Sequence, residues 1–141
     1  MTDFTFTVLG VPVPQGSMRG YVRGGHVAIT SDNTKLRPWR DSVAWAAVEA
    51  MRAQGLTVFE GPMVVRCEFF LPRPKSTPKR ITCPAKKPDL DKLLRSCLDA
   101  MAGIVYRDDA QVVTLTGWKR YAGSPGGALQ PGAIVTISTA S

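Results

Sequence analysis

The chain has 141 residues and a formal net charge of +7, with 18 Lys and Arg against 11 Asp and Glu. This length suits one globular domain, and a composition of 44% hydrophobic and 21% charged residues excludes disorder of the whole chain. The sequence has no apolar run of the roughly 20 residues that cross a bilayer, and its start, MTDFTFTVLG, lacks the features of a signal peptide. We therefore expect a cytoplasmic protein.

The N-terminal part of the chain predicts a strand followed by a β-hairpin. Residues 4–13 begin with phenylalanine and valine alternating with threonine, which is the period of a half-buried strand. Two β-prone runs, 21–23 and 26–29, flank Gly24-Gly25. A glycine pair between such runs is typical of a two-residue hairpin turn.

A helix and a second strand are predicted next. Residues 38–54 place apolar side chains at helical spacing, and Gly55 follows as a stop signal. We expect Trp39 and Trp45 to pack in the core or in an interface. Residues 61–72 begin with apolar side chains in alternate positions, which predicts a strand that crosses the sheet.

Residues 73–88 form a predicted basic loop, which contains six Lys or Arg and four prolines without apolar periodicity. Basic side chains attract polyanions, and nucleic acid is the most common polyanionic partner. We predict that DNA phosphates contact this loop, although a solvated loop without a partner would have the same composition. The predicted DNA contacts in this loop are Arg73, Lys75, Lys79, Arg80, Lys86 and Lys87.

The strongest periodicity in the chain lies at residues 90–102, where apolar side chains recur at i, i+3, i+4, i+7, i+8 and i+11. This pattern predicts an amphipathic helix closed by Gly103. Two more strands, at 111–118 and 133–138, are separated by a loop rich in glycine and proline. The elements together predict a small α+β domain with a mixed sheet and two principal helices.

Cysteine and histidine are too sparse for a zinc site. Cys67, Cys83 and Cys97 are widely spaced without a C-x-x-C pair, and His26 is the only histidine. We expect the three thiols to be free and buried, as cysteines of a reducing compartment usually are.

Five of the eleven carboxylates gather within 21 residues of this basic chain: Asp89, Asp91, Asp99, Asp108 and Asp109. Asp89 and Asp91 begin the amphipathic helix, where acidic side chains cap free N–H groups. Asp108 and Asp109 follow a turn, a position that aspartate favours. Each aspartate taken singly therefore has a structural explanation.

The four outer aspartates together suggest a metal site. The short connection after the helix could bring Asp108 and Asp109 back near Asp89 and Asp91. Four carboxylates at one point repel one another unless a cation neutralises them. Carboxylate oxygens without histidine or thiolate favour Mg²⁺, or Mn²⁺, over zinc. The sequence thus predicts a magnesium site that, beside a basic loop, could hydrolyse a phosphodiester.

Asp99 and Arg95 have separate expected roles. Asp99 lies ~12 Å beyond Asp91 along the helix axis, which is too far for a shared metal centre. We expect it to pair with Arg95 one turn earlier. Arg95 is also placed to support charge on a phosphate, and an exposed ion pair is the alternative explanation.

The segment KPDLDKLLRSCLDAMAGIVYRDDAQV resembles the signature of the RusA family of Holliday-junction resolvases, in which a D-x-D-N-x-x-K helix precedes a D-D-x-Q-V strand. The earlier strand, hairpin and long helix are similar to the same family. The resemblance implies a homodimeric, Mg²⁺-dependent endonuclease that nicks four-way DNA junctions symmetrically. Members of this family are common in phages and prophages. It implies catalytic roles for Asp89, Asp91 and Asp109, with Asp108 beside them.

The chain departs from this signature at two positions. The asparagine of the family is Lys92 here, which we expect to contact DNA or Asp89, and the family's lysine is Arg95. Arg95 keeps the charge but cannot act as a proton donor as lysine might. Two alternatives remain open: a non-catalytic DNA-binding module whose aspartates only cap and turn, and a metal nuclease acting on another branched nucleic acid.

Overall fold

The computed structural model describes residues 3–16, 18–23, 26–31 and 34–140, with the backbone alone for 18–23 and 26–31. The elements in chain order are β1 (Asp3–Leu9), β2 (Met18–Arg23), β3 (His26–Ser31), α1 (Leu36–Ala53), β4 (Met63–Leu71), α2 (Leu90–Met101), the 3-10 helix η1 (Asp109–Gln111), β5 (Val112–Tyr121) and β6 (Gly132–Thr139). No described helix is long and apolar enough to cross a membrane.

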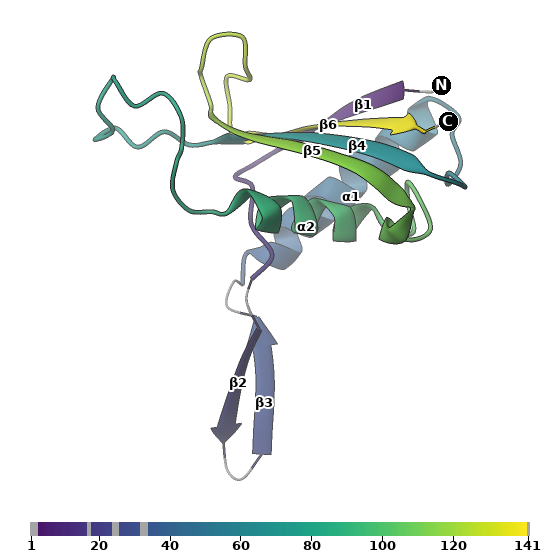
Figure 1. Ribbon diagram of the computed structural model, residues 1–141, viewed down its shortest axis with the longest axis horizontal. Coiled ribbons are helices and arrows are strands. Elements are labelled where there is room, and N and C mark those ends of the chain that lie inside the picture. The colour runs from purple at the N-terminus through teal and green to yellow at the C-terminus, as the bar shows by residue number, and fades with distance from the viewer. Residues whose placement is uncertain (1–2, 17, 24–25, 32–33, 141) are drawn as a thin grey trace.

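Four strands form a mixed sheet in the order β1-β6-β4-β5. The β1–β6 and β6–β4 pairs are antiparallel, while β4 and β5 are parallel. Strands β2 and β3 pair with each other in a separate antiparallel hairpin. Both helices lie on the same face of the four-stranded sheet (Figure 1), so the domain is a small α+β fold as the sequence predicts.

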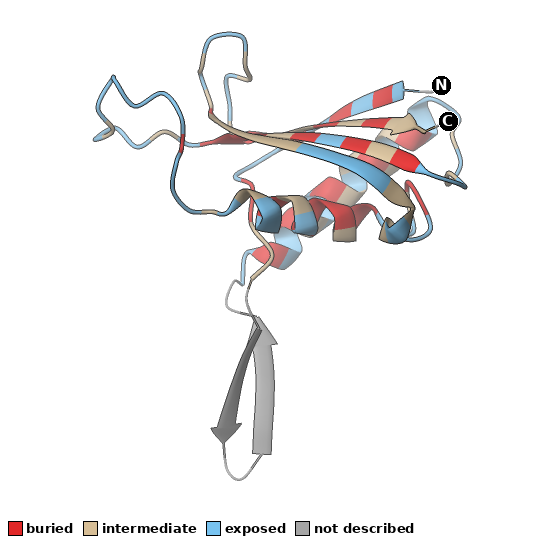
Figure 2. Ribbon diagram, in the orientation of Figure 1, coloured by how far each residue is buried: buried red, intermediate tan, exposed pale blue. Residues whose placement is uncertain are grey.

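The core lies between the sheet and the two helices, as the burial colours of Figure 2 show. Alternate positions of β4 face this core because a strand has a period of two: Met63, Val65, Cys67 and Phe69 are all fully buried. Leu94 of α2 lies so close to β5 that a Cβ on Gly117 would stand 2.9 Å from its Cδ1. Glycine at position 117 therefore permits the close approach of α2 to β5.

The parallel pairing of β4 and β5 determines where the functional segments lie. Parallel neighbours need a crossover connection, and here residues 72–111 provide it through the basic loop, α2 and η1. The basic loop therefore leads into the start of α2, while η1 follows its end (Figure 1).

Each predicted helix and strand is present, with shifted ends. Strand β1 ends at Leu9 instead of residue 13 because Gly10 adopts φ +119 and turns the chain. Helix α1 begins two residues before its predicted start, and β5 runs on to Tyr121. The turn at Gly24-Gly25 lies outside the described residues.

The three thiols are free, but one is not where the sequence analysis expects it. Cys67 and Cys97 are buried in the core, and a hydrogen bond with Cys67, followed by burial, raises the pKa of the Cys97 thiol. Cys83 is exposed, which corrects the expectation of three buried thiols. The reason is that the loop around Cys83 has no apolar periodicity with which to form a core.

Candidate active site

Asp89 and Asp91 both lie at the exposed start of α2. Asp89 is the N-cap residue, with extended backbone angles of φ −69 and ψ 136, yet its side chain accepts no capping hydrogen bond. The capping explanation thus does not account for the Asp89 side chain. Asp91 follows in the first turn of the helix, so both carboxylates face solvent beside the basic loop.

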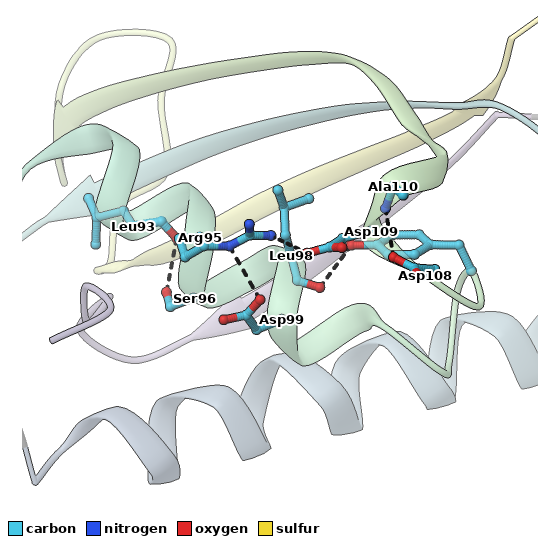
Figure 3. A network of polar contacts seen from close by, with 9 residues as sticks. Leu93, Arg95, Ser96, Leu98, Asp99, Asp108, Asp109 and Ala110 are labelled. Carbon is cyan, nitrogen blue, oxygen red and sulfur yellow. Dashed lines mark hydrogen bonds and ion pairs between the residues drawn. The ribbon is translucent and has the colours of Figure 1, made fainter. Parts of the chain in front are cut away.

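Arg95 connects α2 to the segment that carries Asp109. Its Nη2 donates to Asp109 Oδ2 at 2.6 Å, and its Nε lies 3.3 Å from Asp99 Oδ1 (Figure 3). The Arg95 side chain is 44% exposed and the two carboxylates are 29–35% exposed, so the group is open to solvent. The predicted Arg95–Asp99 pair is confirmed, and Asp109 is an additional partner.

Asp108 has a structural task at the start of η1. Its Oδ1 accepts a hydrogen bond from the Ala110 N–H at 2.9 Å, while Gln111 Oε1 accepts one from the Asp108 N–H at 3.0 Å. The bond to Gln111 Oε1 is one half of a capping box, and the Gln111 N–H supplies the other half by donating to the Asp108 side chain. The hydrogen bond from Ala110, and then one with Asp109, hold the pKa of the Asp108 carboxyl below its ordinary value.

Two residues that the sequence analysis does not single out fix this turn. Gln111 Nε2 donates to the carbonyl oxygens of Phe59 and Gly61 at 3.0 and 2.9 Å. Tyr106 is fully buried and donates its hydroxyl to Leu98 O at 2.8 Å. Burial, followed by the negative charge of Asp109, raises the pKa of Tyr106, so the phenol remains protonated as a donor. The turn that presents Asp109 is thereby anchored to α2 by Tyr106 and to the segment before β4 by Gln111.

The structure does not gather the four predicted metal ligands into one cluster. Among the residues that it describes, no group of three or more His, Cys, Asp or Glu side chains is arranged to hold a metal ion. Asp109 faces Arg95 in the second turn of α2, and Asp108 is engaged in its cap. The donors fit Mg²⁺ in chemistry, since all are carboxylates. The ligand roles of Asp89, Asp91, Asp108 and Asp109 therefore remain predictions, without an assigned metal geometry.

The basic loop is held in place by two of the chain's own cations. Arg73 donates to Ile81 O at 2.6 Å and to Pro78 O at 2.8 Å, and its guanidinium lies 5.2 Å from the centre of the Tyr121 ring. Lys119 of β5, which the sequence analysis does not identify, donates to Lys86 O at 2.7 Å and to Pro88 O at 3.0 Å. The remaining predicted phosphate contacts of the loop are exposed: Lys75, Lys79, Arg80, Lys86 and Lys87.

Arg73→Ala is expected to loosen this loop without unfolding the domain. The variant loses both bonds to carbonyl oxygens and the stacking on Tyr121, worth about 1–2 kcal/mol of local stability in a partly exposed setting. Amide exchange at residues 74–83, followed by mass spectrometry, should accelerate roughly five- to thirtyfold. Lys75→Ala is the matched control and should leave exchange unchanged. Equal rates in the two variants would show that Arg73 does not hold the loop.

Comparison with known proteins identifies the family of this chain. The sequence profile of the family described as "Endodeoxyribonuclease RusA" matches residues 10–130, which is most of the chain. The chain belongs to the RusA family. It is also 33% identical over 135 residues to the uncharacterized protein YqaN of Bacillus subtilis (strain 168), with 89% of this chain and 92% of that protein covered. The resemblance expected from the sequence is confirmed.

RusA membership supports a nuclease that acts on DNA, because the family is one of endodeoxyribonucleases. The matched range includes α2, Arg95, η1 and the basic loop. The exposed carboxylates and the Arg95–Asp109 contact therefore lie within the part of the chain shared with other RusA proteins.

Proposed function

We propose that the protein is a Mg²⁺-dependent, structure-selective endodeoxyribonuclease that resolves four-way DNA junctions by paired symmetric nicks. It would work as a homodimer in the cytoplasm, in the recombination or repair of phage or prophage DNA. The observation that carries the proposal is the RusA match across a segment whose exposed carboxylates flank a charged arginine.

Three carboxylates form the proposed centre: Asp89, Asp91 and Asp109. Their oxygens are the ligands that Mg²⁺ prefers, and a bound ion would activate water and neutralise charge on the phosphate. Asp108 lies beside them, but its oxygen is engaged with the Ala110 N–H, so we propose that it shapes the turn.

Arg95 is proposed to position Asp109 and to support charge on the scissile phosphate. The guanidinium is always protonated, so it cannot donate a proton as the family's lysine might. Its Nη2 holds Asp109, and its Nε faces Asp99. Because the side chain is 44% exposed, a phosphate oxygen can approach the open side of the fork.

The basic loop is proposed to guide DNA toward α2. Its exposed lysines and Arg80 would neutralise phosphates, and exposed Lys92 in the first turn of α2 would extend this surface. Arg73 instead keeps the loop in shape, since its guanidinium is already bonded to Pro78 and Ile81. Symmetric nicks require two equivalent centres, which a homodimer with a two-fold axis supplies.

A competition experiment tests this function. A labelled four-way junction, a flap and a duplex of equal length are offered together to the purified protein, with Mg²⁺ or with EDTA. The proposal predicts that the junction is cut first, and only with Mg²⁺. Cutting of the flap in preference to the junction would support a different metal nuclease.

A non-catalytic DNA-binding module is the second candidate. It is favoured by the structural tasks of Asp108 and of the Arg95 ion pairs, and by the lack of an assembled metal cluster among the described residues. Such a module would bind the junction equally well in EDTA and leave it intact under all conditions.

Replacing Lys86 and Lys87 together by alanine should reduce the salt dependence of junction binding. Each neutralised phosphate releases condensed counterions, so log affinity falls with log salt by roughly 0.9 per contact. The double variant should flatten the slope by up to about two units. The measurement is junction affinity at several salt concentrations, with Ca²⁺ in place of Mg²⁺ to limit cleavage. An unchanged slope would identify the loop as solvated and without DNA contacts.

A further inference from the structure

Helix α1 carries two stripes of side chains, of which the described fold covers one. The covered stripe consists of the buried residues Leu36, Trp39, Val43, Ala47 and Met51. The other stripe, called here the Trp45 stripe, consists of the exposed residues Asp41, Trp45 and Arg52 and the half-buried Val48. At 100° per residue the two stripes lie on opposite sides of the helix. Trp45 is 65% exposed, which is unusual for so large an apolar surface.

The spacing of the Trp45 stripe is that of a helix-to-helix seam. Its members follow one another at intervals of four, three and four residues, which is the alternation of a and d positions in a coiled coil. Trp45 and Val48 occupy the centre of the seam, and Asp41 and Arg52 occupy its ends. Arg52 also contacts Glu49 within the helix at 3.4 Å.

The stripe is complementary to itself when it is turned end to end. Asp41 and Arg52 are equally far from the midpoint of the stripe, and they carry opposite charges. In an antiparallel pair each Asp41 meets the partner's Arg52, and Trp45 meets the partner's Val48. A parallel pair would set Asp41 against Asp41 and Arg52 against Arg52, so charge selects the antiparallel arrangement.

The surface has room for such a contact. Asp41, Ala44, Trp45, Val48 and Arg52 line a shallow depression of about 280 Å³. The small Ala44 side chain beside Trp45 lets a second helix approach closely. Arg52 and Glu49 have side chains that are 72% and 62% exposed, so the partner's Asp41 can join this open pair.

We propose that the Trp45 stripe is the contact between two copies of this chain, packed antiparallel about a two-fold axis. The inference deepens the homodimer of the proposed function by naming its surface, and it requires neither DNA nor metal. One pair of helices buries less area than a standard stable interface, so the dimer should dissociate in the micromolar range.

Charge exchange tests the contact directly. In sedimentation velocity over a range of concentrations, Asp41→Arg and Arg52→Asp should each raise the dissociation constant at least about tenfold, because each sets like charges opposite one another. An equimolar mixture of the two variant chains should regain the dimer. In that mixed pair the introduced arginine faces the introduced aspartate, and native Asp41 faces native Arg52.

The control is Ala53→Glu, which changes an exposed residue of α1 away from the stripe and should leave the dimer unchanged. Circular dichroism melting verifies that each variant is folded. The proposal is overturned if the unaltered chain is monomeric. It is also overturned if either charge variant dimerises as tightly as the unaltered chain, or if the mixture of the two variants stays monomeric. Such a result rejects the Trp45 stripe as the contact. If the protein still cleaves junctions, the proposed nuclease function is retained.

Discussion

Asp91→Asn should abolish junction nicking while leaving junction binding intact or slightly tighter. The amide keeps the shape of the side chain but loses the charge that a divalent cation requires, so the rate should fall on the order of 10³-fold. Removing a negative charge also eases the approach of phosphates. Asp89→Asn and Asp109→Asn should behave in the same way. Single-turnover cleavage of a labelled junction, with affinity measured in Ca²⁺, separates the two effects.

Asp99→Asn is the matched control, because it makes the same chemical change two turns further along the same helix. It removes a half-exposed ion pair with Arg95, worth about 0.2–1 kcal/mol. Nicking should therefore stay within about fivefold of the unaltered protein. Equal inactivation by Asp99→Asn and Asp91→Asn would place the centre at the Arg95 group instead of the helix start.

Gly132→Ala should destabilise the domain by roughly 3 kcal/mol or more, which is at the upper end for overpacking. A Cβ at this position would lie 2.2 Å from Val8 O, in the backbone of the neighbouring strand β1. The pairing of Leu9 with Gly132 would have to shift, because a backbone atom cannot turn aside as a side chain can. The urea midpoint should fall by about 1–2 M, given a slope of roughly 2 kcal/mol/M.

Thr136→Ala on the same strand is the control for this prediction. Thr136 forms an exposed hydrogen bond to Thr5 across β1 and β6 at 3.2 Å, so its loss should shift the midpoint only slightly. If Gly132→Ala shifts the urea midpoint as little as Thr136→Ala does, that result would contradict the observed packing of β6 on β1.

The secondary structure could be predicted because its signals are local. The apolar periodicity of α2 and the alternation in β4 follow from which side of each element faces the core. The ends were less predictable, since β1 stops where Gly10 turns the chain toward Pro131, far away in sequence. The pairing of β4 with β5 is another contact between distant segments that periodicity alone does not specify.

The candidate site could be predicted in part. The Arg95–Asp99 pair lies one turn apart on a helix, so spacing reveals it. The contact of Arg95 with Asp109 depends on how the chain returns after α2, which Tyr106 and Gln111 fix through bonds to distant carbonyls. Lys119 is similar: nothing in its own segment indicates that it binds the loop before Asp89.

The most direct test of the proposed activity is to incubate the purified protein with a synthetic four-way junction, with Mg²⁺ or with EDTA, and to map the cuts on all four strands. The proposed activity predicts paired nicks at symmetric positions on two opposing strands, with Mg²⁺ alone. A junction that is bound equally in both solutions but left intact in Mg²⁺ would contradict it and identify a DNA-binding module.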